Sequence, residues 1–254
     1  MNTRVDASAT WLRRAQPLLG TLVEVGVQRA DVSTHVSLSA GFDAVREVQA
    51  CLSRFEADSD LARFHALRRG EWMAMRPATQ QVLTAARDLQ NASDGAFDIS
   101  LGTAPDGWRC EGNRLHKLDD AVRLDLGGIG KGHAVDCAVA ALIAHGCASG
   151  WVNAGGDLRA FGDAELPIQL RDERIGGTRP FASLRDGAFA TSHSGRHSRS
   201  QLTAGAGRRP VRAHVSVAAP LCLWADALTK VVAINGDNAH PLLARFGAQA
   251  WLHR

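Results

Sequence analysis

The sequence predicts an α+β fold with antiparallel or mixed sheets and packed helices. Apolar residues recur at helical spacing in some segments, and alternate or run together in others. The two kinds of segment follow one another without a regular strand-helix-strand rhythm, which disfavours a doubly wound parallel sheet. The 254 residues, 45% of them hydrophobic, can bury a full core, and no linker-like stretch separates the halves. We therefore expect a tail over residues 1–15 and one domain over residues 16–254.

The first half of the chain is expected to contain a strand and two helices. Residues 22–27 alternate between apolar and polar side chains, as a half-buried strand does. Residues 41–55 place apolar side chains three or four positions apart, which predicts a helix whose end at Phe55 faces a buried surface. A further helix is expected over residues 77–89, opened by Pro77 and followed by a turn at residues 94–95.

The second half is expected to contain more strands than helices. Helices are predicted over residues 134–145 and 223–234, because Gly146 and Gly236 provide stop signals just beyond them. Short apolar or alternating stretches predict strands over residues 122–126, 150–153, 167–171, 213–218 and 249–252.

Two glycine pairs, about one helix apart, are the most informative local feature. They lie in D-L-G-G-I-G-K-G at residues 125–132 and in N-A-G-G-D at residues 153–157. Each follows a short apolar stretch, and the first leads into a predicted helix. Glycine lets the backbone approach an anion closely, and a helix N-terminus offers unpaired N–H groups, so the pattern suggests phosphate binding. A turn is the alternative interpretation of each pair.

Charge and cysteine content exclude several function classes. The formal net charge is only +3 and the basic residues are scattered, so no nucleic-acid partner is expected. No stretch approaches transmembrane length, so no membrane span is expected. The five cysteines are odd in number and form no C-x-x-C pair, and the N-terminus contains no apolar signal segment. These features predict a reduced compartment and a cytoplasmic location.

Further motifs give the chain a specific resemblance. They are L-G-T at residues 19–21, L-S-R-F and D-S-D-L within residues 52–61, D-G-A-F-D at residues 94–98, and V-S-V-A-A-P followed by A-D-A-L within residues 215–228. Together with the glycine motifs, and in the same order, they resemble the ApbE-like flavin transferases, the FAD:protein FMN transferase family. The resemblance covers nearly the whole chain. It implies an α+β fold and transfer of FMN from FAD to a Thr or Ser hydroxyl of an acceptor protein, with release of AMP.

The resemblance also implies a magnesium site. In the family, Mg²⁺ is held by a backbone carbonyl and two side chains, at positions that correspond here to Gly128, Asp226 and Lys230. Asp226 is a hard oxygen donor suited to Mg²⁺. Lys230 stands where many relatives have threonine, and an ammonium group cannot ligate a cation. Either Lys230 extends off the helix toward solvent and the metal keeps Gly128, Asp226, water and phosphate oxygens, or its ammonium group neutralises the pyrophosphate and partly replaces the metal.

The family's flavin contacts can be transferred position by position. They correspond here to Leu19, Phe55, Ala96, Phe97, Asp98, Asp125 and Lys131. Phe55 replaces a tyrosine and could stack on the isoalloxazine ring, with plain core packing as the alternative. Asp125 would accept hydrogen bonds from ribose or ring groups and Lys131 would face phosphate, although such residues after a strand are often caps or surface charges. Leu19 replaces a methionine in the same apolar role.

The general base is the part of the resemblance that this chain departs from. The family motif H-x-I-D-P-x-T-G-x-P corresponds to Q-L-T-A-G-A-G-R-R-P at residues 201–210. The histidine position falls on Gln201, which cannot accept a proton at neutral pH. His197, in the same loop, is the first candidate for a substitute base. Either the alignment slips in this loop or catalysis is impaired.

Two functions therefore remain open. The first is an active, Mg²⁺-dependent FAD:protein FMN transferase that modifies an acceptor flavoprotein. The second is a catalytically impaired FAD-binding relative that acts as a flavin carrier, a regulator or a slow FAD pyrophosphatase. Asp226 and the glycine motifs favour the first, whereas Gln201 and Lys230 favour the second. The sequence leaves the identity of the acceptor and the oligomeric state open.

Overall fold

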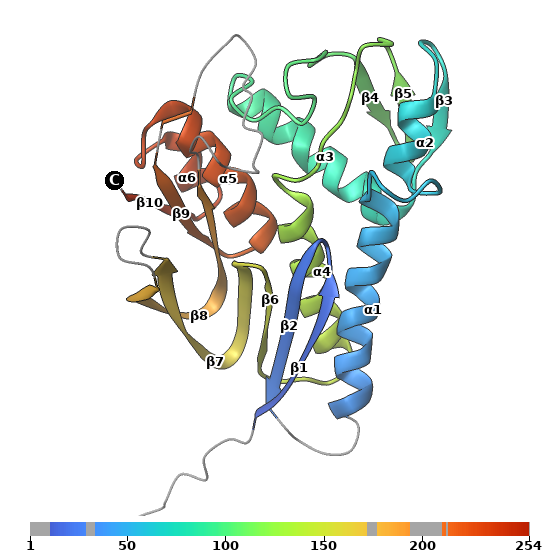
Figure 1. Cartoon of the computed structure of the whole chain (residues 1–254). Helices are drawn as coiled ribbons and strands as arrows, with labels where there is room; N and C mark the ends of the chain where they lie inside the picture. Colours follow the sequence, from blue (N-terminus) through green and yellow to red (C-terminus); the bar gives the residue numbers. More distant parts are fainter. Residues whose placement is uncertain (1–10, 29–33, 172–176, 194–209, 212, 254) are drawn as a thin grey trace, which may run out of the picture.

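An antiparallel sheet forms the main layer of the molecule (Figure 1). The computed structural model describes residues 11–28, 34–171, 177–193, 210–211 and 213–253. In these residues the sheet has seven strands, in the order β1-β2-β6-β7-β8-β9-β10. They are β1 (Trp11–Leu18), β2 (Thr21–Gln28), β6 (Gly150–Ala154), β7 (Asp157–Arg171), β8 (Thr178–His193), β9 (His214–Ala219) and β10 (Gln249–His253). The predicted fold class is confirmed.

Three helices pack against this sheet, and a smaller layer lies beside them (Figure 1). The packing helices are α1 (Thr34–Leu52) on β1 and β2, α4 (Gly130–Ala144) on β6 and β7, and α5 (Cys222–Asn235) on β8 and β9. Helix α4 contacts both of the others. The smaller layer contains α2 (Asp60–Ala66), α3 (Pro77–Ala92) and a sheet ordered β3 (Trp72–Ala74), β5 (Arg114–Lys117) and β4 (Trp108–Glu111), and α6 (Pro241–Arg245) precedes β10.

Side-chain alternation along the strands explains how both faces of the sheet are used. Val23, Val25 and Val27 of β2 are fully buried and belong to the main hydrophobic core with the helices. On β8, Ala188 and Ala190 belong to the same core, whereas Phe189 between them belongs to a separate cluster that packs against Trp251. This period of two is what a strand between two different environments requires.

One predicted strand is wrong. Residues 122–126 have no ladder partner, because their backbone groups bond to a side chain and to turns instead. The Leu124 N–H donates to His65 Nε2 at 2.9 Å, and the Asp125 N–H donates to the Ile99 carbonyl at 2.7 Å. An apolar run can therefore be anchored in an extended form by the smaller layer without joining a sheet.

The remaining differences concern where elements begin and end. Residues 11–15, predicted as a tail, form the first part of β1 and pair with β2. The strand predicted over residues 167–171 is the end of the much longer β7, which pairs with β8 in a hairpin that has register shifts. Helix α1 begins at Thr34 rather than at residue 41, and it ends before residue 55. Periodicity locates the centre of an element better than its ends.

Asp136 of α4 holds the beginning of α5 in place. Its Oδ1 accepts from the Cys222 N–H at 3.0 Å and its Oδ2 from the Leu223 N–H at 2.8 Å. Arg159 of β7 donates to the same carboxylate at 2.8 Å. Helix α5 has no side-chain cap of its own at Leu221, so a carboxylate from a neighbouring helix satisfies its first N–H groups.

Replacing Asp136 with alanine should lower the free energy of unfolding by about 2 kcal/mol, because two N-terminal N–H groups and a guanidinium lose their acceptor. Urea denaturation of the variant would measure this loss. Asp163 is an exposed aspartate on β7, and its replacement with alanine should change stability by less than about 0.5 kcal/mol. Equal effects of the two substitutions would contradict this role of Asp136.

Helices α4 and α5 approach each other at Gly132. A Cβ atom at this position would lie 2.7 Å from the carbonyl carbon of Cys222 and 2.9 Å from the Cα atom of Leu223. Only glycine fits there, because the neighbouring atoms belong to the backbone rather than to a flexible side chain. The glycine after Lys131 in the first motif therefore serves helix packing.

The helices and the cysteines bear on two of the expectations, the absence of a membrane span and the reduced state of the thiols. None of the helices in the described residues is both long and apolar enough to cross a membrane. All five cysteines, which are Cys51, Cys110, Cys137, Cys147 and Cys222, are free thiols.

Candidate functional site

A cavity of about 470 Å³ lies beside the N-terminal end of α4. It is lined by Leu19, Gly20, Val48, Gln49, Leu52, Ser53, Arg54, Phe55, Glu56, Leu61, Asp125, Leu126, Gly127, Gly130 and Lys131. Its volume is in the range of small-molecule and cofactor sites. Of the predicted flavin contacts, the cavity brings together Leu19, Phe55, Asp125 and Lys131.

Leu19 reaches the cavity through the tight turn between β1 and β2. Leu19 and Gly20 both have positive φ, 54° and 69°. Two successive positive values are the hairpin geometry that matches the twist of the flanking strands. The Leu19 N–H donates to Gln49 Oε1 of α1 at 2.7 Å, so the turn is tied to the helix that forms another wall of the cavity.

Phe55 is an exposed wall of the cavity rather than part of the core. The prediction that it faces a buried surface is wrong, because α1 ends at Leu52 and the Phe55 side chain is 85% exposed. The Arg54 guanidinium lies 4.9 Å from the centroid of the Phe55 ring. Because one large aromatic face is left in solvent at the rim of a cavity, core packing does not explain this residue.

Asp125 organises the loop that closes the cavity. Its Oδ1 accepts from the Gly127 N–H at 2.7 Å, and its Oδ2 accepts from Arg54 Nη1 at 3.2 Å. The carboxylate is partly exposed and lines the cavity. Asp125 is therefore a loop anchor with an oxygen near the ligand space, and its contact with a flavin stays a prediction.

Ala96, Phe97 and Asp98 are buried and do not belong to the lining of the cavity. The Asp98 carboxylate accepts from the N–H and the hydroxyl of Ser100 at 2.8 and 2.9 Å, and from the Gly102 N–H at 2.9 Å. These bonds close a local turn. Direct contact of these three residues with FAD stays a prediction.

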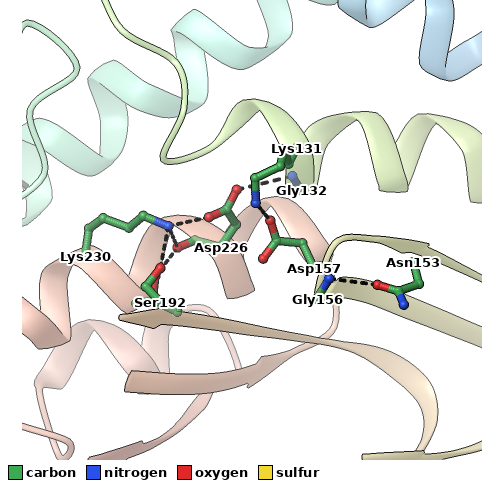
Figure 2. Close-up of polar contacts among 9 residues, drawn as sticks. Lys131, Gly132, Asn153, Gly156, Asp157, Ser192, Asp226 and Lys230 are labelled. Carbon is green, nitrogen blue, oxygen red and sulfur yellow. Dashed lines mark hydrogen bonds and ion pairs between the residues drawn. The ribbon is translucent and has the colours of Figure 1, made fainter. Parts of the chain in front are cut away.

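A cluster of four charged side chains adjoins the cavity at Lys131 (Figure 2). Lys131 of α4 pairs with Asp157 of β7, and Lys230 of α5 pairs with Asp226, one turn earlier in the same helix. Figure 2 shows Asp226 between the two ammonium groups. The Gly132 N–H donates to Asp226 Oδ2 at 3.3 Å, so an N–H of the first turn of α4 also meets this carboxylate.

Burial and mutual charge shift the pKa values within this cluster in opposite directions. Burial, followed by the negative charge of Asp226, raises the pKa of Asp157 to about 6. Burial would also raise the pKa of Asp226, but the ammonium groups of Lys230 and Lys131 outweigh it and lower that pKa. Burial opposes the charge of Lys131, yet Asp226 and Asp157 raise its pKa. At neutral pH the cluster therefore contains two carboxylates and two ammonium groups.

The Asp157 carboxyl is expected to titrate near pH 6, and ¹³C NMR of its carboxyl carbon would measure the midpoint. Below that pH the protonated group no longer carries the charge that faces Lys131. Because the charge of Asp226 contributes to the shift, Asp226→Asn should move the midpoint to a lower pH. A midpoint near 4 in the unsubstituted protein, or no change in the variant, would contradict this coupling.

The charged cluster does not fit magnesium. Mg²⁺ requires oxygen ligands that face it in near-octahedral geometry. Asp226 instead directs one oxygen at Lys230 and the other at Gly132, while Asp157 is occupied by Lys131. In the described part of the chain, no group of three or more His, Cys, Asp or Glu side chains could hold a metal ion.

Of the two alternatives for Lys230, extension toward solvent is wrong. The residue is 8% exposed, and its Nζ is held by Asp226 and Ser192. Gly128, the predicted carbonyl ligand, lies directly beside it, because a Cβ atom on Gly128 would be 3.2 Å from Lys230 Cε. The three positions predicted to bind a metal are therefore neighbours. The ammonium group of Lys230 contacts Asp226, and its side chain lies beside Gly128.

Sequence reasoning missed Asp157 of this cluster and also Ser192, which contacts Lys230. Asp157 is the last residue of the second glycine motif. A charged residue directly after a glycine turn was the feature of the sequence that could have identified it. Ser192 had no local signal. Its hydroxyl accepts from Lys230 Nζ at 2.9 Å and lies 2.8 Å from Thr229 Oγ1, because β8 packs on α5. Such a contact between segments far apart in the chain leaves no spacing pattern.

The second glycine pair forms a tight turn between β6 and β7. Gly155 and Gly156 connect β6 to β7 with φ values of 65° and 103°. The Gly156 N–H donates to Asn153 Oδ1 at 2.9 Å (Figure 2). A Cβ atom on Gly155 would lie 3.1 Å from the Cβ atom of Thr21. The pair thus directs Asp157 toward α4 and allows the L-G-T turn to pack closely.

The predicted base region lies outside the described residues, and this holds for both Gln201 and His197. The described histidines that flank this region in the sequence are His193, at the end of β8, and His214, at the start of β9. Their rings face each other across the strand pair with centroids 4.1 Å apart. The assignment of a base stays a prediction.

Comparison with known proteins identifies what the chain is similar to. The model of the ApbE family matches residues 19–121 and 109–252. A Rhodobacter capsulatus protein named FAD:protein FMN transferase is 28% identical, over 92% of this chain and 54% of its own length. One of the same name from Treponema pallidum is 27% identical, over 70% of this chain and 63% of its own length. The chain thus spans little more than half the length of these curated relatives.

Solved structures share the fold. The apo flavinyl transferase ApbE of Pseudomonas stutzeri aligns with a TM-score of 0.81 and 22% identity, over 96% of this chain and 90% of that chain. The flavin transferase ApbE of Vibrio cholerae aligns with a TM-score of 0.81 and 21% identity, over 96% and 93% of the two chains.

Proposed function

Because this chain belongs to the ApbE family, we propose that it is an FAD:protein FMN transferase, which moves FMN from FAD to a Thr or Ser hydroxyl of an acceptor protein. The names of the curated relatives support this activity. The observation that carries the proposal is the joining of the predicted flavin cavity to a charged cluster at a single residue, Lys131. A flavin ring against Phe55 would place its phosphates toward α4.

The proposed reaction is a phosphoryl transfer from FAD to the acceptor hydroxyl, with AMP as the leaving group. The hydroxyl oxygen of the acceptor forms a bond to the phosphorus of the FMN half of FAD. The bond from that phosphorus to the bridging oxygen breaks, and AMP leaves with that oxygen. The hydroxyl proton passes to a base, for which His197 is the proposed side chain. Lys131 and the N-terminal end of α4 would stabilise the charge on the phosphates.

Magnesium is the cation that the family resemblance implies, and the described charged cluster does not fit it. No step of the proposed reaction is therefore assigned to a metal. Positive charge at the pyrophosphate comes instead from Lys131, which lines the cavity, and from the N-terminal end of α4. We further propose that the partner is an acceptor flavoprotein and that the reaction takes place in the cytoplasm.

Incubation of the purified protein with FAD and a native cell extract tests the function. We expect AMP release that depends on the extract, and a protein band that retains flavin fluorescence on a denaturing gel. AMP release without an acceptor would instead identify an FAD pyrophosphatase. FAD binding without AMP release, with or without extract, would identify a flavin carrier or regulator.

Replacing Phe55 with alanine should weaken FAD binding about fivefold, because an aromatic stacking contact contributes roughly 1 kcal/mol. Thermal stability should not change, since the side chain is 85% exposed. Calorimetric titration with FAD measures the affinity. Trp72→Ala removes a half-exposed aromatic ring in β3, outside the cavity, and should leave FAD affinity unchanged. Equal affinity of Phe55→Ala and the parent protein would remove Phe55 from the flavin site.

A further inference from the structure

Lys230 places a buried ammonium group where the family resemblance expects a metal ligand. We propose that Lys230 replaces the metal ion at this site: its ammonium group neutralises Asp226 and excludes Mg²⁺, so that the protein binds the pyrophosphate of FAD without a divalent cation. The identity of the ligand rests on the proposed function. The exclusion of Mg²⁺ rests on the chain's own residues alone.

The contacts of Lys230 show a group that is held in place. Its Nζ donates to the Asp226 carboxylate, to the Asp226 backbone carbonyl at 3.1 Å and to Ser192 Oγ at 2.9 Å. An ammonium group has three donors, so all of them are used. The Ser192 hydroxyl is itself 2.8 Å from Thr229 Oγ1, which donates to the same Asp226 carbonyl at 2.6 Å. Lys230 is thus fixed by oxygens, as a bound cation would be.

The position of the ammonium group explains why a metal is excluded. Lys230 and Asp226 are one helical turn apart on α5, so their side chains lie on the same face of the helix. The stem of Lys230 passes beside Gly128, whose carbonyl is the other expected ligand. A divalent cation at Asp226 would lie within a few ångströms of a buried ammonium group, which repels it strongly where water is scarce.

The charge balance of the cluster also argues against a bound Mg²⁺ ion. The two carboxylates, Asp226 and Asp157, each have an ammonium partner, Lys230 and Lys131. In the ligand-free protein, addition of Mg²⁺ would give these four charged groups a net charge of about +2. Lys131 also lines the cavity, and its side chain is about one third exposed. Lys131 is therefore available to a phosphate, while Lys230 serves as the internal counter-ion.

Titration of the ligand-free protein with Mg²⁺ alone tests the exclusion directly. We expect no binding heat from the unsubstituted protein and measurable binding by Lys230→Thr, because the substitution removes the ammonium and adds an oxygen. Mg²⁺ binding by the unsubstituted protein overturns the proposal. So does a Lys230→Thr variant that has the parent's circular dichroism spectrum and binds no Mg²⁺. If that variant does not fold, Lys230→Gln, with an amide oxygen and similar length, takes its place with the same expectation.

Fluorescence titration with FAD, in EDTA and in MgCl₂, tests the consequence for the ligand. The unsubstituted protein should bind FAD with affinities that agree within about twofold, whereas Lys230→Thr should bind at least about tenfold more weakly in EDTA than in MgCl₂. A tenfold loss in EDTA for the unsubstituted protein overturns the proposal. No FAD binding under either condition contradicts the proposed function, and the Mg²⁺ titration then still decides the role of Lys230.

Lys117 provides a matched control. It is also a buried lysine, on β5 in the smaller layer, and its Nζ donates to the His65 carbonyl at 3.0 Å. Lys117→Met should gain no Mg²⁺ binding and should bind FAD equally well in EDTA and in MgCl₂. If Lys117→Met gained Mg²⁺ binding as Lys230→Thr does, loss of any buried lysine would be sufficient, and the assignment to Lys230 would be overturned.

Discussion

Gly132→Ala is expected to lower the free energy of unfolding by about 3 kcal/mol or more. The added methyl group would meet the backbone of Cys222 and Leu223, with the carbonyl carbon at 2.7 Å and the Cα atom at 2.9 Å. Neither atom can move by a rotamer change. The first turn of α5 is also held by Asp136 of α4, so separating the two helices would break those hydrogen bonds. Urea denaturation of the two proteins measures the loss.

Gly130→Ala is the matched control, because it lies two residues earlier in the same helix. A Cβ atom there would be 3.6 Å from Leu52 Cδ1, which is an ordinary contact. Alanine is also the better helix former, so this variant should be as stable as the parent or up to about 1 kcal/mol more stable. Denaturation midpoints that are equal for the two variants would show that α4 and α5 do not pack at Gly132 as described.

Asp226→Asn is expected to reduce both stability and FMN transfer. The substitution leaves the buried ammonium group of Lys230 without its counter-charge, which typically costs about 3–5 kcal/mol. It also changes the field around Lys131, which Asp226 helps to keep protonated. We therefore expect transfer to fall at least about tenfold, equivalent to about 1.4 kcal/mol in the barrier. Urea denaturation and a flavin-transfer assay measure the two effects.

A double variant separates the charge effect from a general loss of packing. Asp226→Asn combined with Lys230→Met removes both charges, and a neutral pair of similar volume is often as stable as a buried ion pair. The double variant should therefore recover most of the stability lost by Asp226→Asn, without recovery of transfer. If Asp226→Asn were as stable as the parent, Lys230 would not depend on this carboxylate.

Local chain chemistry was sufficient to predict much of this molecule. The centres of the major helices were correct, since apolar spacing over three turns depends only on near neighbours in the chain. The α+β class followed from the irregular order of helices and strands. The flavin contacts came from the family resemblance and not from local chemistry, and four of them, including Leu19 and Lys131, line one cavity.

Errors arose where a residue's partner comes from a distant segment. Residues 122–126 have the composition of a strand, but His65 and Ile99 supply their hydrogen bonds. Phe55 continues the helical spacing of α1, yet the helix ends before it and leaves it exposed. Periodicity records which side chains are apolar. It contains no information about whether a segment far away in the sequence packs on those side chains.

The motifs of the sequence specify where the chain turns and which residues carry charge. Glycines at residues 155 and 156 require a turn with positive φ, and this requirement is local. Whether Lys230 extends toward solvent or neutralises the pyrophosphate was left open by the sequence. Docking of α5 against β8 excluded the first, because burial removes water and leaves Asp226 and Ser192 as the only oxygens that the described residues offer its ammonium group. Long-range packing sets the dielectric environment and the partners of a charge, and neither is encoded in the spacing of residues along the chain.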